Sequence, residues 1–421
     1  MKKQIQKVAF LIILTIILIA NFSTNFLGKK NADIEGKTFE TFQNDSEYLV
    51  FSEILQDKYK KETNKYGLAE VLDKENIRVD NIWNEIKNYN EEKVIKDYIS
   101  QFGLQGHIFS FLYNKLHVPF WGLKLICCTA LAIVIVAICY YLSKKYNKLM
   151  GAIFYIIFLL SPWVVAFARN LYWVEFTWFL PILFGLIISI NYSNKKILIP
   201  CIFVSILIKC LCGYEYITTI MLATISFFIV DFFMEKEKKK KIDILKTIII
   251  VGICCLLAFG VALCIHAVLR GEGNLLEGIK NIYKEDVLRR TIIVSDKVQF
   301  PEVYKKSLDA GIKETVAKYF EWHTDIIIGI KGEYFNLILI SSIVIMIYNA
   351  LKKEKNCYND ITMFIVFFIT TLSWYVLGKS HSYIHTTMNY VLWYFGFIQI
   401  NLYIITKFVC QKIYSIGRHN G

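Results

Sequence analysis

The sequence lacks cysteine in the places where a disulfide-stabilised domain would need it. All eleven cysteines lie within or beside apolar runs, and none falls in the two longest polar segments, residues 28–118 and 270–334. These segments therefore carry no disulfide framework. The chain also lacks an internal repeat of the kind that many secondary transporters show, which makes a transporter less favoured.

Apolar residues dominate what is present. They make up 55% of the 421 residues, aromatic residues make up 15%, and the mean hydropathy is +0.43, which is outside the range of a soluble domain of this length. Ten apolar stretches approach the length of about 20 residues that crosses a bilayer. We therefore predict an all-α polytopic membrane protein with about ten transmembrane helices. The stretches are residues 8–27, 120–142, 149–167, 176–191, 197–212, 216–233, 246–268, 335–350, 361–378 and 390–408.

The fifth and sixth stretches belong to one apolar tract, residues 197–233, which is too long for a single span. The polar sequence KCLCGYEY at 209–216 interrupts it. Two short spans or one broken span are both compatible with this pattern.

The formal net charge of +13 would suggest nucleic-acid binding in a soluble chain. Here the cations form short clusters between apolar runs, as topology signals do, so we expect no nucleic-acid partner. With ten spans all six clusters lie on one side, which the positive-inside rule assigns to the cytoplasm. Both termini are then cytoplasmic, in a multi-pass protein of the inner (plasma) membrane. The clusters are residues 1–7, 144–148, 194–196, 235–241, 351–355 and 412–418.

This topology divides the chain into five parts. The first apolar run has no small-residue cleavage pattern, so we predict an uncleaved anchor rather than a signal peptide. The parts are the anchor at 1–27, an extracytoplasmic loop at 28–118, a bundle of spans 2–7 at 119–269, a second, helical extracytoplasmic loop at 270–334, and spans 8–10 with a short cytoplasmic tail at 335–421.

An amphipathic helix is predicted in the first loop, within DSEYLVFSEILQDKYKKE. It either lies along the membrane surface or packs as an ordinary soluble helix. The apolar residues near helical spacing are Tyr48, Phe51, Ile54, Leu55 and Tyr59.

Polar residues gather in the turns that this topology places outside the membrane. Charges near hydrocarbon cost several kcal/mol unless they are paired or hydrated, so we expect these residues to share a wet cavity that binds substrate. The alternative is that the cations extend to the interface while Tyr and Trp form an interfacial belt. The candidate substrate-binding residues are Arg169, Glu175, Lys209, Glu215, His381, His385, Arg289 and Arg290.

His381 and His385 stand four residues apart, which on a helix places both imidazoles on one face. A third metal ligand is not visible nearby and the HExxH pattern is absent, so we predict no metal site. Contact with a phosphate is more compatible with the basic surroundings.

Asp45 and Glu47 are the candidate catalytic carboxylates, because they follow the first span and precede the amphipathic helix. A carboxylate there could take a proton from an acceptor hydroxyl, or hold a divalent cation, Mg²⁺ or Mn²⁺, against a phosphate. The alternative is that Asp-Ser-Glu simply begins a helix. No motif requires a cofactor.

The N-terminal anchor, the acidic motif ahead of an amphipathic helix, and the polar outer turns together resemble the GT-C class of polyprenyl-phosphate-sugar-dependent glycosyltransferases. SQFGLQG at 100–106 and ARNLYWVEFTWFLP at 168–181 also resemble stretches of bacterial envelope-polysaccharide membrane proteins. The resemblance implies that an acidic residue of the first outer loop is the catalytic base, and Asp45, or in second place Glu47, matches it. The soluble C-terminal domain of several members has no counterpart here, so we expect the outer loops to recognise the substrate.

The resemblance implies inverting transfer of a sugar from a polyprenyl-phosphate carrier to an envelope glycan or lipid acceptor on the outer face. The protein's partners would then be the lipid-linked sugar, that acceptor and membrane lipid. Three alternatives stay open. A lipid-linked polysaccharide polymerase or ligase would use the outer arginines 169, 289 and 290. A transporter or flippase would use Lys209, Glu215, Asp231 and His266, and a scaffold would use none of them.

Overall fold

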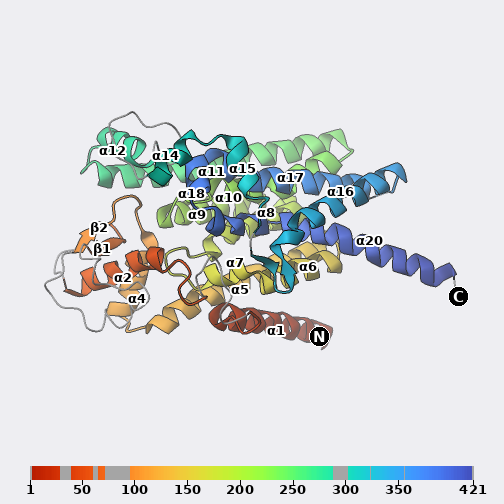
Figure 1. Cartoon of the computed structure of the whole chain (residues 1–421), viewed down its shortest axis with the longest axis horizontal. Helices are drawn as coiled ribbons and strands as arrows, with labels where there is room; N and C mark the ends of the chain where they lie inside the picture. Colours follow the sequence, from red (N-terminus) through yellow and green to blue (C-terminus); the bar gives the residue numbers. More distant parts are fainter. Residues whose placement is uncertain are drawn as a thin grey trace.

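The computed structural model describes residues 2–28, 39–59, 65–71, 95–287, 302–322, 324–354 and 356–419. The helices form an elongated bundle, and most lie close to its long axis (Figure 1). Within the described residues, six helices are long and apolar enough to cross a membrane. They are α1 (Lys2–Thr24), α5 (Phe120–Lys145), α10 (Ile217–Met234), α11 (Lys238–Arg270), α16 (Phe335–Leu351) and α17 (Cys357–Leu377).

Two bent pairs raise this number to eight if each pair is one span. In the first pair α6 (Lys148–Leu160) and α7 (Pro162–Ala168) are bent by 67°, and in the second α19 (Thr386–Asn389) and η6 (Tyr390–Tyr394) are bent by 50° from α20 (Phe397–His419). The predicted class, an all-α multi-pass membrane protein, is therefore confirmed.

The number of ten spans stays a prediction. The two remaining predicted stretches also form helices, but α8 (Phe176–Ile190) has only 15 residues and α9 (Lys195–Cys212) carries three lysines. The polar break in the tract 197–233 separates α9 from α10, so these are two helices and not one continuous rod. Between α8 and α9 lies the short helix η3 (Tyr192–Asn194).

The bend between α6 and α7 follows from Ser161 and Pro162. Pro162 has no N–H to continue the α6 ladder, and the Ser161 hydroxyl instead caps α7 by accepting from the N–H of Val164 at 3.2 Å. The last carbonyls of α6 find partners elsewhere. Leu159 O accepts from the Asn21 amide at 2.7 Å, and Leu160 O accepts from the Ile328 N–H at 3.0 Å.

One end of the bundle, which we call the terminal end, carries the beginning of α1 and the end of α20 (Figure 1). Ion pairs there join helices that are far apart in sequence. Lys145 pairs with Asp231 at 2.7 Å, Lys195 with Asp243 at 3.0 Å, and Lys407 with Asp360 at 2.8 Å. The assignment of this end to the cytoplasm stays a prediction.

The opposite end, which we call the loop end, carries α2 (Asn44–Tyr59), α4 (Leu104–Asn114), α12 (Leu275–Ile282) and α14 (Glu302–Asp309), with the strands β1 (Ala69–Val71) and β2 (Ile95–Asp97) (Figure 1). Each of the two predicted loops, 28–118 and 270–334, contains an antiparallel strand pair, so the prediction of helical loops was incomplete. The other short elements are η4 (Tyr283–Val287), α15 (Ile312–Lys318), the hairpin of β3 (Asp325–Ile327) and β4 (Ile330–Lys331), η5 (Gly332–Tyr334), which leads into α16, and α18 (Lys379–Ile384).

The apolar face of α2 packs on protein. Phe51, Ile54 and Leu55 are buried, and the Phe51 ring meets Phe120 edge to face with centroids 5.3 Å apart. Helix α2 lies against α4 and β1. Of the two alternatives that the sequence left open for this helix, ordinary packing is therefore the one that the structure favours.

Candidate functional site

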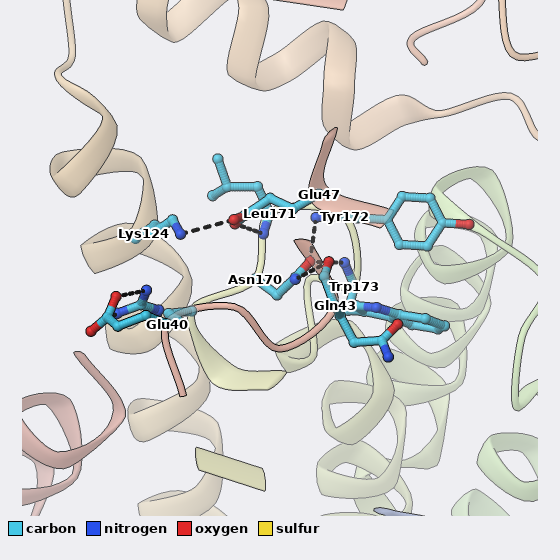
Figure 2. A network of polar contacts seen from close by, with 9 residues as sticks. Glu40, Gln43, Glu47, Lys124, Asn170, Leu171, Tyr172 and Trp173 are labelled. Atoms are coloured by element: carbon cyan, nitrogen blue, oxygen red, sulfur yellow. Dashed lines mark hydrogen bonds and ion pairs between the residues drawn. The ribbon is translucent and has the colours of Figure 1, made fainter. Parts of the chain in front are cut away.

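The turn between α7 and α8, residues 169–175, lies at the centre of the loop-end contacts. The Asn170 side chain shapes it by accepting hydrogen bonds from the N–H groups of Tyr172 and Trp173, at 3.0 and 3.3 Å. Its amide group donates to the Gln43 carbonyl at 3.2 Å. The turn is thereby joined to the segment that leads into α2 (Figure 2).

Glu47 fixes the first turn of α2 to the bundle. One carboxylate oxygen pairs with the Lys124 ammonium of α5 at 2.8 Å, and the other accepts from the Leu171 N–H at 3.0 Å (Figure 2). Glu47 is buried, and its contacts join three segments that are 77 and 124 residues apart in sequence. This arrangement favours a structural role for Glu47 over that of a catalytic base.

Asp45 lies two residues earlier, also in the first turn of α2, and is exposed. Acidic residues in a first turn stabilise a helix through its dipole, so the alternative that Asp-Ser-Glu begins a helix is compatible with the structure. That role does not occupy the Asp45 carboxylate, which stays accessible to a substrate.

Arg169 ends α7 beside the same network. Its guanidinium pairs with the Glu40 carboxylate at 2.6 Å and lies over the Phe39 ring at 4.4 Å. A narrow crevice lined by Glu40, Asn44, Glu47 and Arg169 runs through this contact, and it leaves no room for a water molecule. Because the Glu40 side chain is 69% exposed, an incoming anion could replace it at small cost.

A second cluster joins the turn 169–175 to the turn between α9 and α10. The Gln101 amide donates to the Tyr172 hydroxyl and to the Glu215 carboxylate, each at 2.6 Å. Gln105 donates to the carbonyls of Tyr172 and Cys212. Three of the predicted outer turns, 100–106, 169–175 and 209–216, therefore come together.

Glycines allow the segment 100–106 to approach this closely. Gly103 has φ +78°, and its N–H donates to the Leu211 carbonyl at 3.1 Å. A Cβ on Gly106 would lie 1.5 Å from the Gly67 carbonyl oxygen. Close contact with neighbouring backbone therefore requires glycine at both positions of SQFGLQG, 103 and 106.

Lys209 and Glu175 also lie at the loop end, and both side chains are buried. Lys209 donates to the Gly213 carbonyl at 2.6 Å. Glu175 precedes α8, and neither of its carboxylate oxygens has a hydrogen-bond partner among the described residues. Burial raises the pKa of the Glu175 carboxyl well above its usual range, so the neutral form is favoured.

Aromatic side chains connect these turns to the His381 stretch. The Trp173 ring stacks on Tyr216 at 5.7 Å, Tyr216 meets Trp374 at 5.7 Å, and Trp374 meets His381 at 5.9 Å. The rings of His381 and His385 are 4.8 Å apart, as their spacing predicts. The two histidines therefore lie beyond Trp374 and outside the network of Glu47 and Arg169.

The described residues include no group of three or more His, Cys, Asp or Glu side chains placed to hold a metal ion. Arg289 and Arg290 lie outside the described residues. Sequence reasoning did not single out Lys124, Gln101 or Tyr172. The available signal for Lys124 was a cation near the start of an apolar span, where an acidic partner is expected.

The comparisons with known proteins leave the class open. The chain matches no protein-family model, no curated protein and no solved structure.

Proposed function

We propose that this protein is an integral membrane glycosyltransferase that moves a sugar from a polyprenyl-phosphate carrier to an envelope glycan or lipid acceptor at the loop end, on the extracytoplasmic side. The observation that supports it is the attachment of α2. Glu47 holds the first turn of α2 against the turn that carries Arg169, and Asp45 is left exposed within that same helical turn.

In the proposed reaction Asp45 takes the proton of an acceptor hydroxyl as that oxygen attacks the anomeric carbon. The bond between this carbon and the phosphate oxygen breaks, so the configuration inverts and polyprenyl phosphate leaves. Arg169, released from Glu40, stabilises the leaving phosphate. His381 and His385 lie beyond Trp374, so they offer donors to a part of the substrate farther from Arg169. Glu47 is already ion-paired, which favours Asp45 over Glu47 as the base.

Transport is less favoured because the polar residues that it would use have structural partners. Asp231 pairs with Lys145 at the terminal end, and His266 contacts the Ile99 carbonyl at 3.0 Å. Lys209 donates to a backbone carbonyl. A polymerase or ligase remains the alternative, since Arg169 would also suit it. A monosaccharide on a monophosphate carrier favours our proposal, and an oligosaccharide diphosphate favours the alternative.

Asp45→Asn tests the proposal in purified full-length protein reconstituted into vesicles. Labelled polyprenyl-phosphate monosaccharides are supplied one at a time with acceptor glycan, and release of polyprenyl phosphate is measured. Loss of a general base predicts a rate lower by a factor of about 10² to 10⁴, with an unchanged melting temperature. Asp309→Asn, at an exposed acid of α14, is the matched control and should keep full activity. Normal turnover by Asp45→Asn would remove Asp45 from this role.

A further inference from the structure

A groove of about 800 Å³ lies where the polar loop-end elements meet the membrane span α5. Three elements form it: the end of α2, the end of α4 with the connection that follows, and the first turn of α5. We call it the α4–α5 groove. Its lining residues are Asp57, Lys58, Tyr113, Asn114, Lys115, His117, Pro119, Phe120 and Trp121.

Large apolar side chains beside the groove are exposed on the protein surface. Trp121 is 71% exposed, Leu116 57% and Phe111 56%. Removing a side chain of this size from water is favourable by about 1.5–3 kcal/mol, so contact with lipid is favoured over contact with water. Trp121 is the second residue of a helix long and apolar enough to span a bilayer. Tryptophan at the end of a span is typical of the headgroup level, so the groove opens at that depth.

The groove carries a net positive charge at this depth. Lys58, Lys115 and His117 are exposed, and neither lysine forms an ion pair with a described residue. Asp57, the only acid among the described lining residues, accepts a hydrogen bond from the Ser110 hydroxyl, so it is turned toward α4. The Asn114 amide group is likewise used within the protein, by the Ile54 carbonyl at 3.0 Å. The two lysines are therefore available to an anion.

We propose that the α4–α5 groove binds the phosphate headgroup of an anionic membrane lipid. Lys58 and Lys115 contact the phosphate, and Trp121 and Leu116 lie against the first segments of the acyl chains. The cations of the groove and the exposed apolar side chains beside them match the two parts of such a lipid, and a soluble phosphate would leave the apolar side chains without a role. This site does not depend on sugar transfer.

Native mass spectrometry of the full-length protein in detergent micelles tests the proposal. The micelles are titrated with phosphatidylglycerol, with phosphatidylcholine, or with inorganic phosphate. Removing one lysine near an anionic lipid should weaken phosphatidylglycerol binding about fivefold, and Lys58→Gln with Lys115→Gln about 25-fold. Lys284→Gln with Lys313→Gln, at exposed lysines outside the groove, is the matched control and should change nothing. Trp121→Ala should weaken the binding of both phosphatidylglycerol and phosphatidylcholine.

If both double lysine variants lost phosphatidylglycerol binding equally, the proposal would be overturned, because the lipid would then be attracted to the charged surface in general. Displacement of phosphatidylglycerol by inorganic phosphate, with no effect of Trp121→Ala, would also overturn it and indicate a soluble ligand. Melting temperatures of the lysine variants and of Trp121→Ala should agree with that of the wild type, because all of these side chains are exposed and contribute little to stability.

Discussion

Removing the charge of Glu47 should destabilise the protein through Lys124. In Glu47→Gln the new amide oxygen can still accept from the Leu171 N–H, but the Lys124 ammonium, whose side chain is only 16% exposed, loses its counter-charge. Breaking a buried ion pair from one side costs about 3–5 kcal/mol, and the residual exposure of Lys124 favours the lower value. At an unfolding entropy of about 2 cal/mol/K per residue, a loss of about 3 kcal/mol lowers the melting temperature of a chain of this length by about 3 °C.

The double variant separates the ion pair from the hydrogen bond. Glu47→Gln with Lys124→Met removes both charges, so no unpaired charge stays buried. We expect its melting temperature to exceed that of Glu47→Gln alone, because the coupling of a close pair amounts to about 0.5–3 kcal/mol. Glu237→Gln is the control, since Glu237 and its partner Lys240 are both more than half exposed and such pairs contribute little.

The buried thiols provide the assay. Cys127 and Cys128 lie one helical turn beyond Lys124 and are at most 1% exposed. Once a thiol-reactive dye has reacted with the more accessible cysteines of the folded protein, its further reaction on heating reports the release of buried thiols such as these. Melting curves are recorded for the wild type, both single variants and the double variant in one detergent and at one heating rate. The single variants are Glu47→Gln and Lys124→Met. If the melting temperature of the double variant falls by the sum of the decreases in the two single variants, Glu47 and Lys124 are not coupled, which contradicts the prediction.

The remaining predictions concern backbone contact and buried charge. Gly106→Ala should lower the melting temperature, at a cost of about 1–3 kcal/mol or more, because its Cβ would meet the Gly67 carbonyl; Gly252→Ala, with open space around its Cβ, should be neutral or stabilising by up to about 1 kcal/mol. Glu175 has a raised pKa, so its folded form binds a proton more tightly than the unfolded form, and its contribution to stability falls as the pH rises above its usual pKa of 4.5. Glu175→Gln should therefore flatten the decline of melting temperature above that pH, and an unchanged pH profile would contradict the assignment.

The sequence predicted the helices well because their signal is local. A long apolar run can satisfy its backbone in a membrane only as a helix, so each predicted stretch is helical, although 149–167 and 390–408 are each divided between two helices. The partners of the charged side chains could not be predicted in the same way. Arg169 stands six residues before Glu175 but pairs with Glu40, 129 residues away, because the segment before α2 folds back over the turn. Nothing in the composition of either segment specifies that contact.

The surroundings of α2 show the same limit. Its spacing of Phe51, Ile54 and Leu55 suits a lipid surface and a protein surface equally. Helix α2 packs on protein because α4 and β1 lie beside it. Strand β1 has only three residues, and its partner β2 begins 24 residues after β1 ends. So short a strand gives almost no periodic signal of its own. Its pairing is a tertiary property, and the packing of α2 depends on it.

The bend at Ser161 and Pro162 also bears on how the protein is assembled. The two carbonyls that the bend releases accept hydrogen bonds from groups that the ribosome makes at very different times. These groups are the Asn21 amide of the anchor α1 and the N–H of Ile328 in the β3–β4 hairpin. Until residue 328 emerges, the Leu160 carbonyl has to be hydrated or held by a neighbour in the insertion machinery. In nascent chains that end before residue 328, the segment of α6 and α7 should therefore be loosely inserted. Synthesis of the β3–β4 hairpin should then join this early segment to the late part of the protein.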